Sequence, residues 1–359
     1  MASKYQEIAA LLRRQIAAGE YPPGTQLPTE QALCQTHGVS RQTIRQSLAC
    51  LVKEGLIERR QGSGSRVLDR SAKPEEPMPQ RTIAVVTTYI SDYIFPSILR
   101  EAEAVLSVNN CSPLLFATKN QVSNERRVLQ SLLTLPNLDG ALVEGTKTAL
   151  PNPNLDLYRK LQDRGIPLVF MNGNYQELTG AVAVLDDNYG GGYQLVKYLA
   201  GKGHTRIAGI FKSDDIQGHQ RYAGFAAALR DHGLPLEDDH LFWYSTETKN
   251  MLHAGGPLWE ELQNRVLRGC TAVVCYNDEI ASYLLQSLQH SGIRVPADLA
   301  VVSFDNSRYS DLSAIRITSL SHENQNVGRL AAETLVRLLA GQPCQSQYAS
   351  WQLIEKESS

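Results

Sequence analysis

Residues 38–48 read Gly38-Val39-Ser40-Arg41-Gln42-Thr43-Ile44-Arg45-Gln46-Ser47-Leu48. Ser40 is a natural N-cap, so a helix is expected to begin at Arg41. Apolar side chains then recur at helical spacing and are expected to face inward, namely Ile44, Leu48, Leu51 and Val52. Arg41 and Arg45 lie one turn apart, so both guanidinium groups share a different, outward face.

A shorter helix precedes this one. Residues 30–36 are predicted to be helical, and His37-Gly38-Val39 is predicted to form a tight turn. Two helices joined by a short glycine-containing turn make a helix-turn-helix, whose second helix places its N-terminal side chains in the DNA major groove. Taken alone this pattern is weak, because an ordinary helix with a solvated basic face would look the same.

Residues 56–67 favour the DNA-binding alternative. They are interpreted as two short strands around a glycine tip at Gly62-Ser63-Gly64, which makes a wing. A wing placed a few residues after a helix-turn-helix is much more specific than the helix pair. The charge agrees, since residues 1–70 hold ten Lys and Arg against six Asp and Glu, whereas the remainder has an excess of acidic residues.

The whole segment 4–68 resembles the winged-helix head of the gluconate-repressor (GntR) family of bacterial regulators. The matching residues include Leu27-Pro28-Thr29-Glu30, the run from Gly38 to Arg45, and Gly62-Ser63-Gly64. Many relatives carry a basic residue where this chain has Gln31, so we expect its base preference to differ from theirs. The resemblance implies operator DNA as a partner.

We predict that Arg41 and Arg45 read bases, with guanine the favoured partner of arginine. Hydroxyl and guanidinium groups at Thr29, Thr43 and Arg59 are expected to hold phosphates, and the wing tip is expected to enter the minor groove. The predicted DNA contacts are Thr29, Glu30, Ser40, Arg41, Gln42, Thr43, Arg45, Arg59, Gln61, Gly62, Ser63 and Gly64.

The bulk composition is that of an ordinary globular chain, with 42% apolar and 20% charged residues in 359, which is enough for two or three domains. No apolar run is long enough for a signal peptide or a membrane span, so we expect a cytoplasmic protein associated with the nucleoid. The six cysteines show no metal-binding spacing, so no metal site is predicted. Cys34 and Cys50 are expected to be buried as small apolar residues.

A different pattern begins after residues 69–80, a proline-containing charged segment that we interpret as a linker. From residue 81 to 359, short β-branched runs alternate with helical segments, which predicts parallel sheets with helices on both faces. The number of predicted strands is larger than one sheet usually holds. We therefore predict a multidomain chain: a winged helix-turn-helix at 1–68, and an α/β effector and dimerisation domain at 81–359 built of two doubly wound lobes.

Ligands of doubly wound sheets bind at the carboxyl ends of the strands. There the sequence places aromatic rings, carboxylates, amides and a lysine, a set suited to a sugar, whose hydroxyls need acceptors and donors in pairs. Each strand-end Asp or Asn could instead be a helix cap or turn former, and for a single residue the two alternatives are about equal. Across six strands, the sugar site is the better interpretation.

Residues 81–357 also resemble the effector domain of the lactose/galactose-repressor family, which is related to periplasmic sugar-binding proteins. The matching stretches include Asp186 to Gly191, Gly203 to Ala208, Arg221 to Phe225, Tyr276-Asn277-Asp278 and Val301 to Asp305. The resemblance implies that Arg221, Asn277 and Asp305 hold sugar hydroxyls and that His322 lies in a crossover strand. The predicted effector contacts are Tyr89, Asp92, Tyr93, Phe95, Lys119, Glu144, Asn172, Arg221, Asn277, Asp278, Asp305 and His322.

A gluconate-type head on a galactose-type body resembles the arabinose-responsive regulators of Gram-positive bacteria, so the resemblance implies L-arabinose as effector. The residues by themselves indicate only a small polyhydroxylated ligand, and another pentose, a hexose or a phosphosugar stays open. We expect a repressor of sugar-utilisation genes that leaves its operator when sugar binds. A homodimer is expected, because one head buries too little surface for tight specific binding.

Two other classes fit the sequence less well. A transport protein would carry a signal peptide and no basic head. A glycosidase could use the strand-end carboxylates, but its chemistry gives no reason for a winged head. Gly62-Ser63-Gly64 lacks the third glycine of a dinucleotide loop, and Gly190-Gly191-Gly192 is better explained by close helix packing than by phosphate binding. We therefore predict no catalytic residues and no cofactor.

Overall fold

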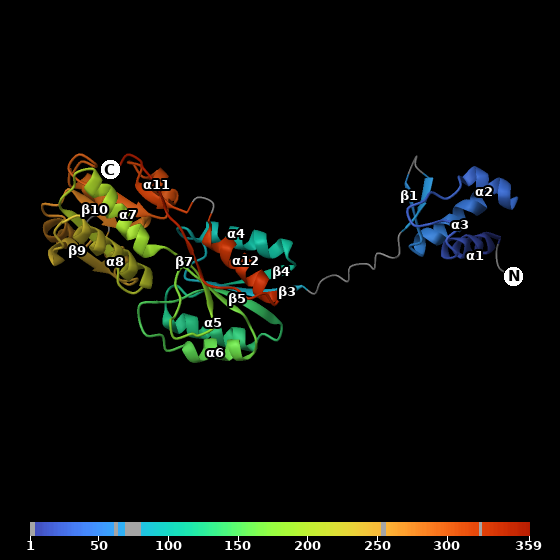
Figure 1. The fold of residues 1–359 in the computed structure, drawn as a ribbon, viewed down its shortest axis with the longest axis horizontal. Coiled ribbons are helices and arrows are strands. Elements are labelled where there is room, and N and C mark those ends of the chain that lie inside the picture. The colour runs from blue at the N-terminus through green and yellow to red at the C-terminus, as the bar shows by residue number, and fades with distance from the viewer. Residues whose placement is uncertain (1–3, 61–63, 69–79, 253–255, 323–324) are drawn as a thin grey trace. The chain divides into compact units, whose positions relative to one another are not determined.

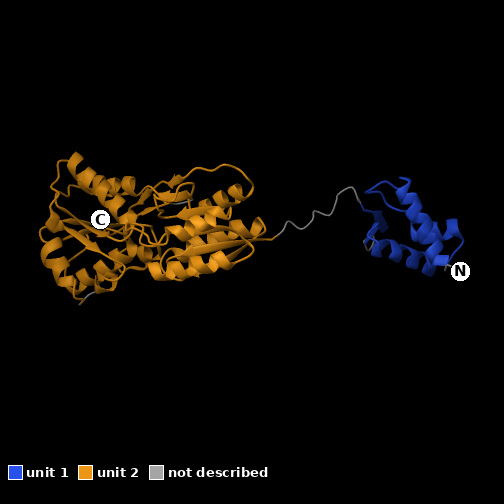
Figure 2. Ribbon diagram, turned by 90° about the horizontal axis from the view of Figure 1, so that it is seen from below, with its two compact units in different colours: residues 1–78 blue, residues 79–359 orange. Residues whose placement is uncertain are grey.

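The computed structural model describes residues 4–60, 64–68, 80–252, 256–322 and 325–359. The chain forms two compact units, residues 1–78 and 79–359, which Figure 2 distinguishes by colour. The predicted linker lies at the division between the units, and its residues 69–79 fall outside the described part of the chain.

The smaller unit is a three-helix head with a wing (Figure 1). Its elements are α1 Lys4–Ala17, α2 Glu30–His37, α3 Arg41–Lys53, β1 Ile57–Arg60 and β2 Gly64–Val67. The strands pair antiparallel, with Ile57 opposite Val67. Gly38 adopts φ 63° at the end of α2, so the tight turn of the helix-turn-helix uses a left-handed residue that glycine accommodates.

Two expectations about packing in this head are corrected. Ile44, Leu48 and Leu51 are buried as predicted, but Val52 is 40% exposed. The reason is that α1, α2 and β1 cover the side of α3 that carries the other three residues and leave Val52 at its rim. Cys34 and Cys50 are half-buried rather than buried.

The larger unit consists of two lobes, each built on a six-stranded sheet (Figure 1). The strands of the first lobe run in the order β13-β7-β6-β5-β3-β4, and those of the second in the order β14-β12-β11-β10-β8-β9. All strand pairs are parallel except β12 with β14. This confirms the prediction of two doubly wound subdomains.

The first sheet holds β3 Arg81–Thr87, β4 Cys111–Ala117, β5 Leu138–Glu144, β6 Leu168–Met171, β7 Val182–Asp186 and β13 Gln347–Ala349. One face packs against α4 Phe95–Val108 and α12 Val327–Leu339, and the other against α5 Val122–Thr134 and α6 Leu155–Asp163. The two apolar clusters on opposite faces show a sheet buried on both sides, as expected for parallel strands.

The second sheet holds β8 Ile207–Lys212, β9 Leu241–Tyr244, β10 Ala272–Cys275, β11 Ala300–Phe304, β12 Thr318–Ser321 and β14 Gln352–Ile354. One face packs against α7 Asn188–Gly201 and α8 Ile216–Asp231, and the other against α10 Asp278–His290 and the segment 259–266. The chain crosses between the lobes three times, after β7, after β12 and between β13 and β14.

In place of one regular helix, residues 259–266 form one α-turn, Trp259–Glu261, and one π-turn, Leu262–Val266. The wider π-turn lets Trp259, Leu262 and Val266 all face the apolar core of the lobe. Three short elements were not predicted: α11 Arg308–Leu312, β13 and β14. Each is only three to five residues long, too short for a periodic pattern.

Candidate nucleic-acid interface and effector site

The recognition face of α3 is exposed, and the wing lies next to it in sequence and in the fold. Arg41 and Arg45 are both exposed, as predicted. The Arg45 Nε lies 3.1 Å from the Glu30 carboxylate, and Arg59 of β1 also donates to that carboxylate. Glu30 therefore holds two predicted DNA contacts in place, which suits its negative charge better than a phosphate contact would.

Hydroxyl groups of two predicted DNA contacts, Thr29 and Ser40, cap the two helices. Thr29 Oγ1 accepts from the Ala32 amide at 3.2 Å, and Ser40 Oγ accepts from the Thr43 amide at 3.3 Å. The Ser40 and Thr43 hydroxyls lie 3.0 Å apart. Both helix N-termini thus present ordered hydroxyls, and a helix N-terminus favours phosphate oxygens.

The wing is anchored at its base. Arg66 Nε donates to the Gly24 carbonyl at 2.6 Å, and Gln26 pairs with Arg66 as an isolated bridge. Gln42 is exposed, and Gly64 begins β2 at φ 83°. The other predicted wing-tip contacts, Gln61, Gly62 and Ser63, lie outside the described residues.

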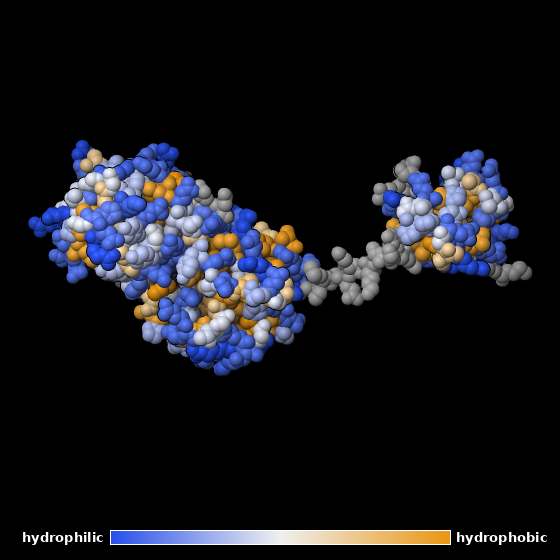
Figure 3. Space-filling view, in the orientation of Figure 1, coloured by the Kyte–Doolittle hydropathy of each residue, from blue (hydrophilic) through white to orange (hydrophobic). Residues whose placement is uncertain are grey.

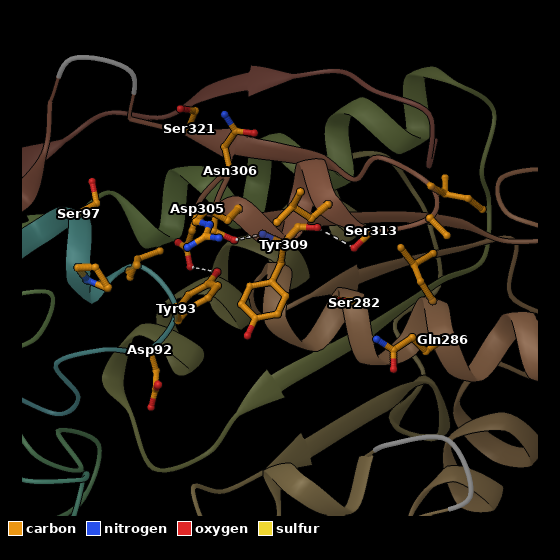
Figure 4. Close-up of a pocket in the computed structure, with 18 of the residues that line it drawn as sticks. Asp92, Tyr93, Ser97, Ser282, Gln286, Asp305, Asn306, Tyr309, Ser313 and Ser321 are labelled. Atoms are coloured by element: carbon orange, nitrogen blue, oxygen red, sulfur yellow. Dashed lines mark hydrogen bonds between the residues drawn. The ribbon is translucent and has the colours of Figure 1, made fainter.

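A cavity of about 1450 Å³ opens at the strand ends where the two lobes meet (Figure 4). Six of its lining residues come from those strand ends and crossovers: Asp92, Tyr93, Asn172, Asp186, Asp305 and His322. All but Asp186 belong to the predicted effector contacts. Farther out, the cavity is bounded by side chains of α10 and α11, among them Gln286 and Tyr309.

Arg221 lies at the inner end of this site, where two carboxylates converge on it. Its side chain is 2% exposed, with Nη2 at 3.5 Å from Asp305 Oδ1 and 3.7 Å from Asp186 Oδ2. Its Nε donates to Asn188 Oδ1 at 2.9 Å, and its guanidinium carbon lies 4.1 Å from the centroid of the Phe304 ring. The guanidinium is therefore fixed in position and remains charged.

His322 joins Asp186 from the crossover after β12. Its Nε2 lies 2.9 Å from Asp186 Oδ1, its Nδ1 lies 3.0 Å from the Ser350 carbonyl, and its ring stacks on Trp351. Burial alone lowers the pKa of His322, but the hydrogen bond and charge of Asp186 outweigh it and raise the pKa above 6.5. Because both ring nitrogens face oxygen acceptors, the doubly protonated imidazolium is the favoured form.

Tyr93 reaches from the first lobe to the second. Its hydroxyl donates to Asp305 Oδ2 at 2.5 Å and accepts from the Asp278 amide at 3.1 Å, and Figure 4 shows the ring beside Tyr309. Burial raises the pKa of Tyr93, so it remains a donor. Tyr93 has φ 55°, Asn172 φ 63° and Asp305 φ 94°, so three residues that line the cavity adopt left-handed backbone.

Seven described residues among the predicted effector contacts do not line the cavity: Tyr89, Phe95, Lys119, Glu144, Arg221, Asn277 and Asp278. Arg221 contacts Asp186 and Asp305, which line the cavity, on the side away from it. Lys119 is exposed on a turn, and Phe95 is buried at the start of α4 against the Tyr89 ring.

For Asn277 and Asp278 the structure gives internal partners, which corrects the expectation for Asp278. Asn277 Oδ1 caps α10 by accepting from the Ile280 amide at 3.1 Å. Asp278 is fully buried, and its carboxylate accepts from the Ser303 and Ser319 hydroxyls and the Ser307 amide. Burial raises the pKa of Asp278 to about 7. Its role is to hold the ends of β11 and β12 together.

Glu144 also has internal donors. It accepts from the Thr88 amide at 2.7 Å, from the Thr88 hydroxyl and from Asn172 Nδ2 at 3.2 Å, and burial raises its pKa to about 6. Through Asn172 it orients one residue of the cavity. Two polar side chains were not predicted, Lys212 at the end of β8 and Gln217 in the first turn of α8, although their position after a predicted strand was an available signal.

Within the described residues no group of His, Cys, Asp and Glu is arranged to hold a metal ion. None of the described helices has the length and apolar character needed to span a bilayer.

Comparison with known proteins agrees with this architecture. Residues 4–67 match the family "Bacterial regulatory proteins, gntR family", and residues 196–359 match "Periplasmic binding protein-like domain". Among solved structures, the transcription regulator CcpA of Lactococcus lactis superposes with a TM-score of 0.68 at 23% identity, over 78% of this chain and 99% of that one. A CelR–cellobiose complex superposes with a TM-score of 0.66 at 22% identity, over 93% of this chain and 100% of that one. These likenesses show the fold.

Two full-length relatives are more informative. An arabinose metabolism transcriptional repressor of Halalkalibacterium halodurans is 38% identical over 94% of this chain and 89% of its own length. The corresponding protein of Geobacillus stearothermophilus is 37% identical over 94% of this chain and 91% of its own. The chain is accordingly a DNA-binding regulator rather than an enzyme, and it belongs to the family of arabinose metabolism transcriptional repressors.

Proposed function

We propose that this repressor binds its operator, on the nucleoid, as a homodimer and is released when L-arabinose occupies the cavity between the two lobes. The observation that carries the effector site is the convergence of Asp186, from the first lobe, and Asp305, from the second, on the buried guanidinium of Arg221. A ligand bound there contacts both lobes at once.

The chemistry of the cavity fits a neutral sugar. The carboxylates of Asp186 and Asp305 accept from hydroxyls, whereas the Asn172 amide donates to them. The carboxylates of Asp186 and Asp305 would repel the phosphate group of a phosphosugar, which favours a neutral sugar. The choice of L-arabinose among neutral sugars is supported by the names of the relatives.

The proposed mechanism couples closing of the lobes to the placement of the winged heads. A sugar that binds the closed arrangement more tightly than the open one shifts the population toward the closed form. If the closed form sets the two heads of a dimer at a spacing that does not suit the operator, DNA affinity falls by the same coupling free energy.

An apolar edge of the first lobe supports a dimer. Val108, at the end of α4, is 83% exposed, and Leu114 and Leu115 of the edge strand β4 are 38% and 48% exposed. Figure 3 shows apolar atoms gathered over this end of the larger unit. An exposed edge strand with adjacent leucines is a surface that proteins normally cover. A second copy of the chain is the occupant we propose.

The test is titration of the purified chain with L-arabinose, D-xylose, D-ribose, D-galactose and a pentose phosphate, followed by operator binding with and without the best ligand at fixed salt. We expect L-arabinose to bind and to weaken operator binding. Unchanged operator affinity at saturating L-arabinose would refute the proposal. If another sugar binds and L-arabinose does not, that sugar is the effector in place of L-arabinose. Analytical sedimentation is expected to show a dimer for the wild-type chain and a monomer for Leu115→Glu. A monomeric wild-type chain would refute the proposed homodimer.

A further inference from the structure

A second set of contacts joins the two lobes through residues that do not line the cavity. From the first lobe come Asn120, after β4, and Lys147 and Thr148, after β5. From the second come Asp214 and Asp215, after β8, and Thr246 and Glu247, after β9. We call these seven residues the clasp.

Lys147 makes the ionic part of the clasp. Its ammonium donates to Glu247 and lies 3.7 Å from Asp214 Oδ2. The Lys147 side chain is 17% exposed and that of Asp214 is 4% exposed. The hydrogen bond from Lys147 lowers the pKa of Glu247 to about 2. The Glu247 side chain is 60% exposed, so solvent screens its pair with Lys147, whereas the interaction of Lys147 with the buried Asp214 is screened less.

Further hydrogen bonds across the lobes lie beside the ion pairs. Asn120 Nδ2 donates to Thr246 Oγ1 at 2.6 Å and to Asp215 Oδ1 at 3.3 Å, and Thr148 Oγ1 accepts from the Ile216 amide at 3.0 Å. Asn120 has φ 52° and Lys147 has φ 46°. The Lys147 amide donates to Asn120 Oδ1 at 2.8 Å within the first lobe, so these two left-handed residues support each other where the clasp forms.

One segment connects the clasp to the cavity. Lys212 Nζ lies 3.6 Å from Asp214 Oδ1 and pairs with Asp215, and Gln217 donates to Asp186 Oδ2 at 2.9 Å. A Cβ on Gly218 would lie 1.9 Å from the Lys212 carbonyl oxygen, so the start of α8 is pressed against the end of β8. Residues 212–217 are therefore packed together, and they hold both the clasp carboxylates, Asp214 and Asp215, and the Gln217 side chain that supports Asp186.

We propose that the clasp sets the free energy of closing the two lobes, and that Lys147 is a positioning residue for the effector site without touching the ligand. This inference rests on the proposed function. If sugar binds the closed form and operator binds the open form, a weaker clasp lowers sugar affinity and does not lower operator affinity. A merely structural role would lower both.

The test compares Lys147→Met with Lys202→Met in the full chain. Lys202 forms an ion pair with Glu355 inside the second lobe, so its variant loses a lysine pair that does not join the lobes. We expect Lys147→Met to weaken L-arabinose binding fivefold or more, taking about fivefold as the lower end of typical coupling, with operator affinity without sugar equal to or above wild type. Lys202→Met should leave both affinities at the wild-type value. Unchanged sugar affinity in Lys147→Met, or loss of both affinities, would overturn the inference.

A measurement without sugar separates this inference from the proposed function. Amide hydrogen exchange of residues 145–149 and 212–217 is expected to be faster in Lys147→Met than in wild type and in Lys202→Met. Equal exchange rates would reject the clasp whatever the sugar result. Absence of L-arabinose binding to the wild-type chain, with faster exchange in Lys147→Met, would reject the proposed effector and keep the clasp.

Discussion

The Glu30 carboxylate lies between Arg45 of α3 and Arg59 of β1, and both arginine side chains remain at least 40% exposed. Exposed ion pairs of this kind contribute little to stability, about 0–1 kcal/mol. A carboxylate in a DNA interface also repels phosphates. What Glu30 supplies is orientation, because it fixes two guanidinium groups that would otherwise sample many rotamers.

Glu30→Gln is therefore expected to reduce specificity rather than overall DNA binding. Loss of the ordered arginines should cost about 1–3 kcal/mol at the operator, the range of one bidentate base contact, while binding to a scrambled duplex stays equal or rises. Fluorescence anisotropy with both duplexes at one salt concentration measures the ratio. Arg13→Ala, which breaks the Arg13–Glu54 pair elsewhere in the head, is the control and should leave the ratio unchanged. Equal losses on both duplexes would contradict the role given to Glu30.

His322 makes stability depend on pH in a defined direction. Its pKa is raised in the folded protein, so its contribution is fully present below its unfolded pKa of about 6.5 and is lost as the pH rises through the raised value. We expect the difference in unfolding free energy between wild type and His322→Gln to be largest at acidic pH and to shrink at alkaline pH. Urea unfolding at a series of pH values measures it. Taking the difference cancels the titrations of Asp278 and Glu144, and a difference that grows with pH would be the wrong sign.

At the scale of elements, segments with a capping, periodic or β-branched pattern could be predicted, including the four-residue strands of the wing, whereas short segments without such a pattern could not. The recognition helix, the wing and the alternation of strands and helices all follow from capping, spacing and β-branched runs. The strands β13 and β14 have three residues each and depend on pairing with β7 and β12, which are distant in sequence. The effector site shows the same limit. Asp305 and His322 could be predicted from strand ends and resemblance, but only the fold shows that Asp278 faces inward and that Lys147 reaches the other lobe.

The glycine run Gly190-Gly191-Gly192 of α7 was predicted to serve close packing, and the structure confirms this for Gly191 and Gly192. A Cβ on Gly192 would lie 2.1 Å from the Arg221 carbonyl oxygen, whereas one on Gly201 of the same helix would meet nothing within 4 Å. Gly192→Ala is expected to separate the helices, to destabilise the fold by about 1–3 kcal/mol and to weaken sugar binding through Arg221. Gly201→Ala is the matched control and should be neutral or stabilising by up to about 1 kcal/mol. Thermal unfolding measures both, and similar melting temperatures for the two variants would contradict this packing.

At the scale of the whole molecule, reading DNA and sensing the effector are carried by different compact units, so one can be disabled without the other. Arg221 lies at the point where this separation can be tested. Lysine keeps the positive charge but has no planar fork to lie between Asp186 and Asp305 and no flat face to stack on Phe304.

Arg221→Lys is thus expected to bind operator as wild type does in the absence of sugar and to stay bound when L-arabinose is added. The loss of sugar affinity should be at least about tenfold, because one hydrogen bond to a charged group contributes about 1.5–3 kcal/mol. Operator binding over a range of L-arabinose concentrations, with circular dichroism to show that the variant is folded, is the measurement. Arg316→Lys, at an exposed pair with Glu357 in the same lobe, controls for the exchange of side chains. Release of Arg221→Lys at the sugar concentration that releases wild type would mean that the effector is held elsewhere, because no ligand between the lobes could be indifferent to the group that both lobes converge on.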